Sequence, residues 1–212
     1  MPLDPVIGIL RMPMGNLRSA YNAVYQNGFD PQFVDGASEE ELDGLTHLIV
    51  PGVGNFSAVM NHLEADGVAD RVRAFAASGR PLLGICAGMQ LLAERGTEGG
   101  DTPGLGLVHG QIDRLPEDPS HILPHVGWSS VRFRFDHPVL DGVKPGRDFY
   151  FVHSYALRGG RDDEYLGETE YGVPFASIVA RGNVVGFQFH PEKSQANGLK
   201  LIENFCFWDG TC

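Results

Sequence analysis

One cysteine of the sequence stands where a catalytic nucleophile is expected. Cys86 follows the apolar run 81–85 and precedes the helical pattern of residues 89–92. Gly84 and Gly88 flank it as G-x-C-x-G, a spacing that permits a sharp strand-to-helix turn and close approach of a substrate. N–H groups at the start of a helix favour a thiolate and can hold an oxyanion. Taken alone, the pattern also fits a cysteine packed in the core, where free cysteines are common.

A second motif supplies the base that such a thiol needs. The segment 186–194 reads GFQFHPEKS, and its alternation places His190 at the end of a strand, with Glu192 two positions later. Side chains two residues apart in extended chain share a face, so we expect Glu192 to lie beside the His190 ring. A histidine oriented by a carboxylate is a general base for a thiol. We therefore predict a catalytic triad of Cys86, His190 and Glu192.

A glycine-rich loop is predicted next to this nucleophile. The apolar strand at 48–50 runs into Pro51-Gly52-Val53-Gly54. Ligand sites of open α/β sheets lie at the carboxyl ends of the strands, where glycines let a loop expose its N–H groups. The segment is thus a candidate second donor for an oxyanion hole, although by itself it also fits an ordinary turn.

These motifs resemble those of the class I (triad-type) glutamine amidotransferases. GICAGMQLL around Cys86 and GFQFHPEKS around His190 match the segments that carry the Cys-His-Glu triad of that family. Three further motifs, at 51–54, 124–128 and 150–155, are similar to those of the glutaminase subunits of imidazole glycerol phosphate synthases. The resemblance covers nearly the whole chain, with the motifs in the same order.

The resemblance implies a mechanism that needs no cofactor and no metal. Glutamine is the implied substrate, which Cys86 attacks at the side-chain carboxamide and which is released as glutamate and ammonia. The implied oxyanion donors are the N–H groups of Val53 and Ala87, after the loop of Gly52 and Gly54 has reoriented. The same comparison places Gln90 at the substrate.

The resemblance also implies a partner. The glutaminase subunits of this family form a heterodimer with a (β/α)₈ cyclase, which uses the ammonia to make imidazole glycerol phosphate and the purine precursor AICAR in histidine biosynthesis. By this analogy Trp128, Tyr150 and Lys193 face the cyclase. Their plainer interpretation is a core aromatic, a strand aromatic and a surface lysine.

Some positions depart from the family pattern and leave alternatives open. Ala87 stands where leucine is usual, Ser129 stands where asparagine is common, and the loop 11–16 lacks the residues that the family commonly has there. A paralogous glutaminase that feeds a different acceptor, such as a nucleotide-sugar amidating synthase, is therefore one alternative. A stand-alone γ-glutamyl cysteine hydrolase and a catalytically idle regulatory subunit are two others.

The composition of the chain limits its domain organisation, its partners and its location. The 212 residues, 42% of them hydrophobic, are suited to a single domain spanning 1–212. A net charge of −11 argues against nucleic-acid binding, and no apolar run reaches the length of a membrane span. Three cysteines without a CxxC pair suggest neither a disulfide framework nor a zinc site, so a reducing, cytoplasmic location is expected.

The elements that must position the triad follow from the apolar patterns. Short buried-type strands at 6–10, 33–34 and 48–50 alternate with helical patterns, which predicts parallel strands joined by crossover helices. We therefore predict a three-layer α/β fold of flavodoxin-like, class I glutamine amidotransferase-like type. Its mixed, mostly parallel central sheet is flanked by helices and carries an added antiparallel β portion. Strands of that portion are expected at 107–115, 126–135, 149–156, 165–169, 175–180 and 184–189; helical segments are expected at 56–78, interrupted at Gly67, and after Ser194.

Overall fold

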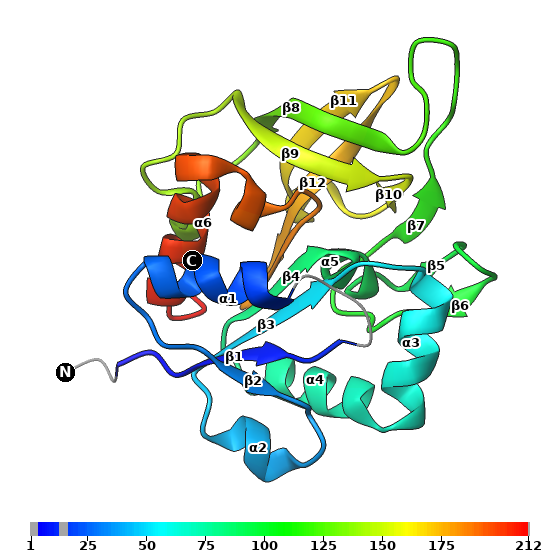
Figure 1. The fold of residues 1–212 in the computed structure, drawn as a ribbon. Helices are drawn as coiled ribbons and strands as arrows, with labels where there is room; N and C mark the ends of the chain where they lie inside the picture. The colour runs from blue at the N-terminus through cyan, green and yellow to red at the C-terminus, as the bar shows by residue number, and fades with distance from the viewer. Residues whose placement is uncertain (1–3, 13–16, 212) are drawn as a thin grey trace.

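The chain folds around one mixed β-sheet (Figure 1). The computed structural model describes residues 4–12 and 17–211. Their strands are β1 (Ile7–Leu10), β2 (Gln32–Val34), β3 (His47–Gly52), β4 (Leu82–Cys86), β5 (Arg95–Gly96), β6 (Thr102–Pro103), β7 (Gln111–Arg114), β8 (His125–Phe133), β9 (Arg147–His153), β10 (Tyr155–Arg158), β11 (Tyr165–Tyr171), β12 (Val173–Arg181) and β13 (Val184–Phe187). The helices are α1 (Leu17–Gln26), α2 (Glu39–Asp43), α3 (Phe56–Ala65), α4 (Val68–Ala77), α5 (Ala87–Leu91) and α6 (Gln195–Phe207), with 3₁₀ turns η1 (Pro138–Leu140), η2 (Asp162–Glu164) and η3 (Pro191–Lys193).

The centre of the sheet is parallel and its far side is mostly antiparallel, with β5 and β7 as a parallel pair. The strand order is β2-β1-β3-β4-β13-β12-β10-β7-β5-β6, and the pairs from β2 to β13 are all parallel. β12 and β10 continue in antiparallel pairing, while β8, β9 and β11 form an antiparallel extension above them (Figure 1). The predicted mixed, mostly parallel architecture with an antiparallel portion is confirmed.

The register of two central strands decides where the candidate catalytic residues fall. Ile85 of β4 lies opposite Phe187 of β13 in parallel pairing. Both strands therefore end at the same edge of the sheet. Cys86 ends β4, and the chain after β13 leads directly to His190, so residues far apart in sequence arrive at one place.

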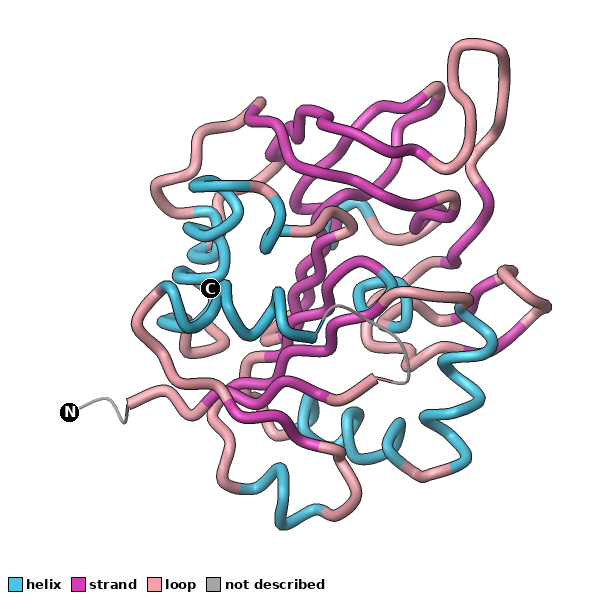
Figure 2. Tube along the Cα trace, in the orientation of Figure 1, coloured by secondary structure: helices cyan, strands magenta, loops and turns pink. Residues whose placement is uncertain are grey.

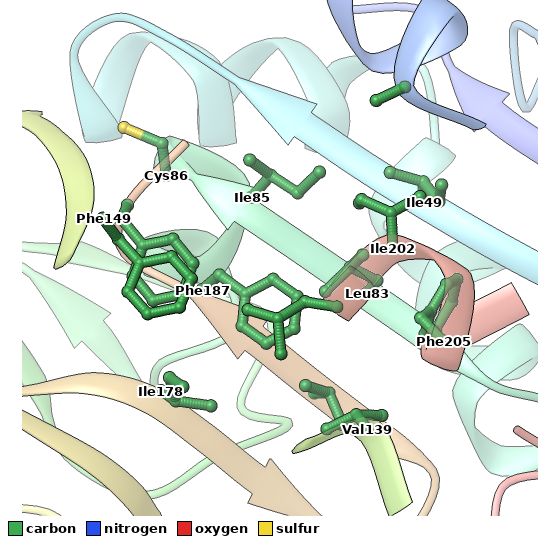
Figure 3. Close-up of a cluster of buried hydrophobic side chains, with 14 of the residues drawn as sticks. Ile49, Leu83, Ile85, Cys86, Val139, Phe149, Ile178, Phe187, Ile202 and Phe205 are labelled. Carbon is green, nitrogen blue, oxygen red and sulfur yellow. The ribbon is translucent and has the colours of Figure 1, made fainter. Parts of the chain in front are cut away.

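Helices cover the two faces of the sheet as separate layers (Figures 1 and 2). α1 and α6 pack on one face, where Val24, Ile202 and Phe205 join one hydrophobic cluster. α3, α4 and α5 pack on the other face and join a second cluster. β3 and β4 are buried along their whole length, as expected for parallel strands covered on both sides. Figure 3 shows the first cluster, with Cys86 at its margin.

The helical segments agree with the sequence patterns. α3 and α4 are separated at Gly67, whose φ of 66° is a left-handed conformation that glycine adopts without strain. α1 begins at Leu17, and the preceding loop falls partly on residues 13–16, outside the described residues. None of the helices in residues 4–12 and 17–211 combines the length and apolarity needed to cross a bilayer.

Two expected strands differ from the structure. The strand expected at 149–156 is broken at Ser154 into β9 and β10, because β9 pairs with β8 whereas β10 pairs with β7 and β12. The strand expected at 107–115 is formed only at Gln111–Arg114. Alternation along the sequence indicates extended chain but does not say which neighbour each part pairs with, so both boundaries were predicted wrongly.

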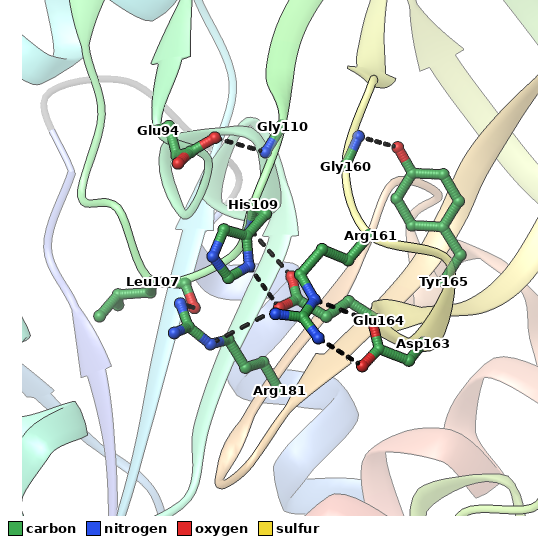
Figure 4. Close-up of polar contacts among 10 residues, drawn as sticks. All are labelled: Glu94, Leu107, His109, Gly110, Gly160, Arg161, Asp163, Glu164, Tyr165 and Arg181. Carbon is green, nitrogen blue, oxygen red and sulfur yellow. Dashed lines mark hydrogen bonds and ion pairs between the residues drawn. The ribbon is translucent and has the colours of Figure 1, made fainter.

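The segment before β7 is held both by backbone hydrogen bonds to residues 92–94 and by side chains (Figure 4). The buried carboxylate of Glu164 accepts hydrogen bonds from the backbone N–H and the ring of His109. Arg181 forms an ion pair with Glu164 and donates to the carbonyl of Leu107, while the N–H of Gly110 donates to Glu94. These side-chain bonds add to the backbone bonds and satisfy further polar groups of the segment.

The turn after Cys86 depends on the absence of a side chain at Gly88. A Cβ atom built on Gly88 would lie 1.8 Å from the carbonyl oxygen of Val50, a backbone atom that cannot move aside locally. We expect Gly88→Ala to lower the free energy of unfolding by at least about 3 kcal/mol, measured by urea denaturation. Gly44→Ala is the matched control, because no atom lies within 4 Å of its Cβ position and its φ is −74°. Equal stabilities of the two variants would contradict this packing argument.

Candidate active site

Cys86 occupies the corner between β4 and α5 that the sequence predicts. It precedes the first helical residue and has φ 54° and ψ −111°, an unfavourable conformation for a residue with a side chain. Backbone strain of this kind persists where the surrounding structure imposes it, which is common at catalytic residues. Gly52 is the partner of Cys86 in the β3–β4 register, and a Cβ on Gly52 would approach the nitrogen of Gly88 to 2.8 Å. The two glycines therefore let β3 lie directly against the corner.

His190 and Glu192 are joined by a short, buried hydrogen bond. Nδ1 of His190 lies 2.8 Å from Oε1 of Glu192, and their side chains are only 5% and 4% exposed. The sequence predicted an extended chain between these two residues. The structure has the 3₁₀ turn η3 instead, and this turn brings the two side chains together. Ser194 fixes the turn, since its hydroxyl donates to the carbonyl of His190 and accepts from the N–H of Tyr150.

Cys86 and His190 line one cavity of about 420 Å³. The thiol points toward the carbonyl of Val152, with Sγ 3.8 Å from that oxygen. Burial lowers the pKa of His190, but hydrogen bonding and charge interaction with Cys86 and Glu192 outweigh it and raise the pKa from 6.5 to about 10. Both neighbours therefore favour the imidazolium form of the His190 ring, which can protonate a leaving group.

The loop and helix residues expected around the nucleophile lie at the same cavity. Val53, Gly54, Ala87 and Gln90 all line it, whereas Gly52 is buried beneath it at the end of β3. Gly54 has φ 119°, a value that favours glycine. Ala87 begins α5, whose first N–H groups are free of intrahelical partners. The structure thus places every predicted oxyanion or substrate residue in contact with the cavity or directly behind it.

Two further parts of the cavity wall were missed by the sequence analysis. Glu98 lines the cavity and accepts a hydrogen bond of 3.0 Å from the N–H of Phe56 at the start of α3. Burial raises the pKa of Glu98, and the bond from Phe56 opposes that shift. The segment 152–155, where β9 gives way to β10, forms another wall. The sequence offered one sign of Glu98, which is an acidic residue beside the glycines 99–100. It offered none of the 152–155 wall, because that wall depends on long-range strand pairing.

The three residues expected at a partner surface gather on one patch. The rings of Trp128 and Tyr150 pack edge to face, with centroids 5.8 Å apart, and Nζ of Lys193 lies 6.0 Å from the Tyr150 centroid. Trp128 is 48% exposed, which excludes the interpretation of a core aromatic. Lys193 also lines the cavity, so the patch adjoins the candidate site.

His153 of the 152–155 wall forms a buried pair with His125. His153 Nδ1 lies 2.9 Å from the carbonyl of Tyr155, so this nitrogen must donate and Nε2 must accept. Nδ1 of His125 lies 3.0 Å from that Nε2 and therefore donates to it. Nε2 of His125 then accepts from the hydroxyl of Ser129, 2.9 Å away. The carbonyl thus fixes both tautomers of the pair.

The pair is expected to remain neutral in mild acid. Burial lowers the pKa of His125 to about 4 and that of His153 to about 3. Nitrogen-15 NMR between pH 5 and 8 should show both rings neutral and in the tautomers given above. Below the ordinary pKa of 6.5 the unfolded chain binds protons that the folded chain does not, so this pair lowers stability as pH falls from 6.5 toward 4. A ring that titrates near pH 6.5 would contradict the assignment.

The fold and the site together define the class of the protein. Residues 14–208 match the sequence profile described as "Glutamine amidotransferase class-I", so the chain belongs to the class I glutamine amidotransferases. The fold is also that of the solved structure of PurLQS from Thermotoga maritima, with a TM-score of 0.74 at 22% identity over 96% of this chain and 98% of that one. No group of three or more His, Cys, Asp or Glu suited to a metal ion occurs in the described part of the chain.

Curated relatives narrow the family further. The chain is 42% identical to the imidazole glycerol phosphate synthase subunit HisH of Caldanaerobacter subterraneus subsp. tengcongensis over 94% of this chain and 97% of that one. It is 43% identical to the subunit of the same name from Geobacillus thermodenitrificans, over 94% of each chain. Within its class, the chain therefore belongs to the HisH family.

Proposed function

We propose that this chain is the glutaminase subunit of an imidazole glycerol phosphate synthase and uses Cys86, His190 and Glu192 as its catalytic triad. The observation that carries the proposal is that Cys86 and His190 line one cavity of about 420 Å³, while Nδ1 of His190 is hydrogen-bonded to Oε1 of Glu192. The relatives named HisH support the identity of the synthase.

The geometry supports a two-step hydrolysis. His190 takes the proton of the Cys86 thiol, the resulting thiolate attacks the carboxamide carbon of glutamine, and the oxyanion that forms is held by N–H groups of Val53 and Ala87. The His190 imidazolium gives its proton to the departing ammonia, which leaves a thioester on Cys86. The neutral ring then takes a proton from water, whose attack releases glutamate. Glu192 holds the ring orientation and stabilises its charged form.

We assign recognition of the α-amino group of glutamine to Glu98 in the cavity wall. Glu98 lines the cavity, and only one of its carboxylate oxygens, Oε2, is bonded to the N–H of Phe56. A carboxylate is a strong acceptor for an ammonium group. We therefore assign the α-ammonium of glutamine to Glu98.

Ammonia release calls for a protected route to an acceptor, because ammonia in bulk water is protonated and lost. The exposed patch of Trp128, Tyr150 and Lys193 adjoins the cavity and is the surface we assign to the cyclase subunit in a heterodimer. Cys86 and Cys206 are both free thiols, which are typical of a reducing compartment, and this supports the cytoplasmic location included in this proposal.

The deciding experiment measures glutamine turnover by the purified chain alone and with the cyclase loaded with its ribotide. We expect little turnover by the chain alone and strong stimulation by the loaded cyclase. Equal, brisk rates in both conditions would favour a stand-alone γ-glutamyl hydrolase. Turnover that responds only to another acceptor enzyme would favour a paralogous glutaminase, and the absence of turnover in every condition would reject the enzymatic proposal.

A further inference from the structure

A fully buried glutamine lies behind the candidate site. Gln188 is 0% exposed and follows β13, two residues before His190. Its Oε1 accepts a hydrogen bond of 3.1 Å from Nε2 of Gln90, which lines the cavity. Its own Nε2 is buried and has no partner among the described residues. An unpaired buried amide costs stability, so an apolar side chain at this position would be the more stable choice.

The orientation of both carboxamides follows from one backbone carbonyl. Nε2 of Gln90 lies 2.8 Å from the carbonyl oxygen of Tyr155, which can only accept a hydrogen bond. The atom of Gln90 at this position must therefore be the nitrogen. Since that nitrogen also faces Gln188, the atom of Gln188 that meets it must be the oxygen. A flip of either side chain would set two acceptors or two donors against each other.

This arrangement determines what Gln90 can offer a ligand. Both N–H groups of Gln90 are used, one by Tyr155 and one by Gln188. The atom left for the cavity is Oε1, a hydrogen-bond acceptor. Together with the carboxylate of Glu98, it makes this part of the wall suited to a ligand group that carries N–H donors, either an ammonium or a primary amide.

We infer that Gln188 is a positioning residue that locks the Gln90 carboxamide with its oxygen toward the substrate. The inference rests on the proposed function, because it assigns the N–H donors of glutamine to that oxygen. It also explains why a buried amide with an unpaired nitrogen occupies position 188. The oxygen of this amide is needed to accept the hydrogen bond from Gln90.

The test compares three variants in the complex with the loaded cyclase. Gln188→Leu removes the acceptor, so Gln90 can pivot on its remaining bond to Tyr155; we expect the KM for glutamine to rise about 5- to 10-fold and kcat to change less than about 2-fold. Its melting temperature should be unchanged or raised.

Gln188→Glu keeps a carbonyl acceptor, because burial holds the new carboxyl neutral, and should restore a KM close to that of the wild type. Ser177→Ala is the matched control, since Ser177 is also 0% exposed, has an unpaired hydroxyl and bonds to Gln188 only through the backbone.

A second readout separates this inference from the proposed function. Hydrogen exchange of the Gln90 side-chain NH₂, followed by NMR without substrate, should be slow in the wild type and in Ser177→Ala and fast in Gln188→Leu. An unchanged KM and unchanged exchange in Gln188→Leu would overturn the inference, as would a KM increase of the same size in Ser177→Ala. If the wild type does not turn over glutamine in any condition, the proposed function fails, and the exchange measurement alone decides whether Gln188 positions Gln90.

Discussion

Replacement of Cys86 by alanine is expected to lower the rate of glutamine hydrolysis by about 10⁴-fold or more, because no other group in the cavity can form the thioester. The small side chain leaves the β4–α5 corner otherwise intact. The variant should therefore still bind the cyclase and support synthesis from added ammonium. Release of glutamate and formation of imidazole glycerol phosphate from each nitrogen source are the measurements.

Cys206→Ala is the control for this prediction. Cys206 is fully buried in α6, and burial raises the pKa of its thiol to about 12, so it is not a nucleophile at neutral pH. We expect this variant to retain its glutaminase rate. Loss of activity in both variants would point to a structural effect, and loss of ammonium-dependent synthesis in Cys86→Ala would contradict the proposed division of labour between the subunits.

Glu192→Gln is expected to reduce kcat by about 10³-fold with little change in the KM for glutamine. The buried carboxylate accepts from Nδ1 of His190 and its negative charge stabilises the positive ring, whereas the glutamine amide can accept the same bond but carries no charge. The variant should also lower the pKa of His190 from about 10 toward 6.5, which a nitrogen-15 titration of the ring measures directly. A slow variant whose His190 still titrates near pH 10 would show that Glu192 acts by other means.

The sign of the pH dependence follows from the raised pKa of His190. Protonation of the ring favours the folded state, so its contribution to stability is fully present below pH 6.5 and is lost as pH rises through about 10. The dependence of stability on pH between 7 and 10 should be weaker in Glu192→Gln than in the wild type. Denaturant midpoints at a series of pH values test this expectation.

Local patterns predicted the strand-to-helix corner at Cys86 and the first half of the fold. The apolar run that ends at Cys86, flanked by Gly84 and Gly88, specifies a strand, a sharp turn and a helix within a few residues. The break between α3 and α4 was equally clear, because Gly67 interrupts the helical periodicity. Such features depend on neighbours in sequence, so a sequence contains most of the information that they need.

Features that depend on distant pairing were not predictable in the same way. The wall at 152–155 exists because β9 and β10 choose different partner strands, and alternation does not encode that choice. The contact between His190 and Glu192 was expected, but from an extended chain and not from the turn η3. The bonds that orient Gln90 join residues of α5, β10 and the end of β13, which only the folded sheet brings together.

The place of β13 in the sheet has a consequence for synthesis of the protein. This strand comes late in the chain yet lies between β4 and β12, so β4 has no neighbour on that side until most of the polypeptide has been made. Until then, Cys86 at the end of β4 lacks the neighbouring His190 ring, which follows β13. The cavity that Cys86 and His190 share can therefore form only after residue 190 has been made.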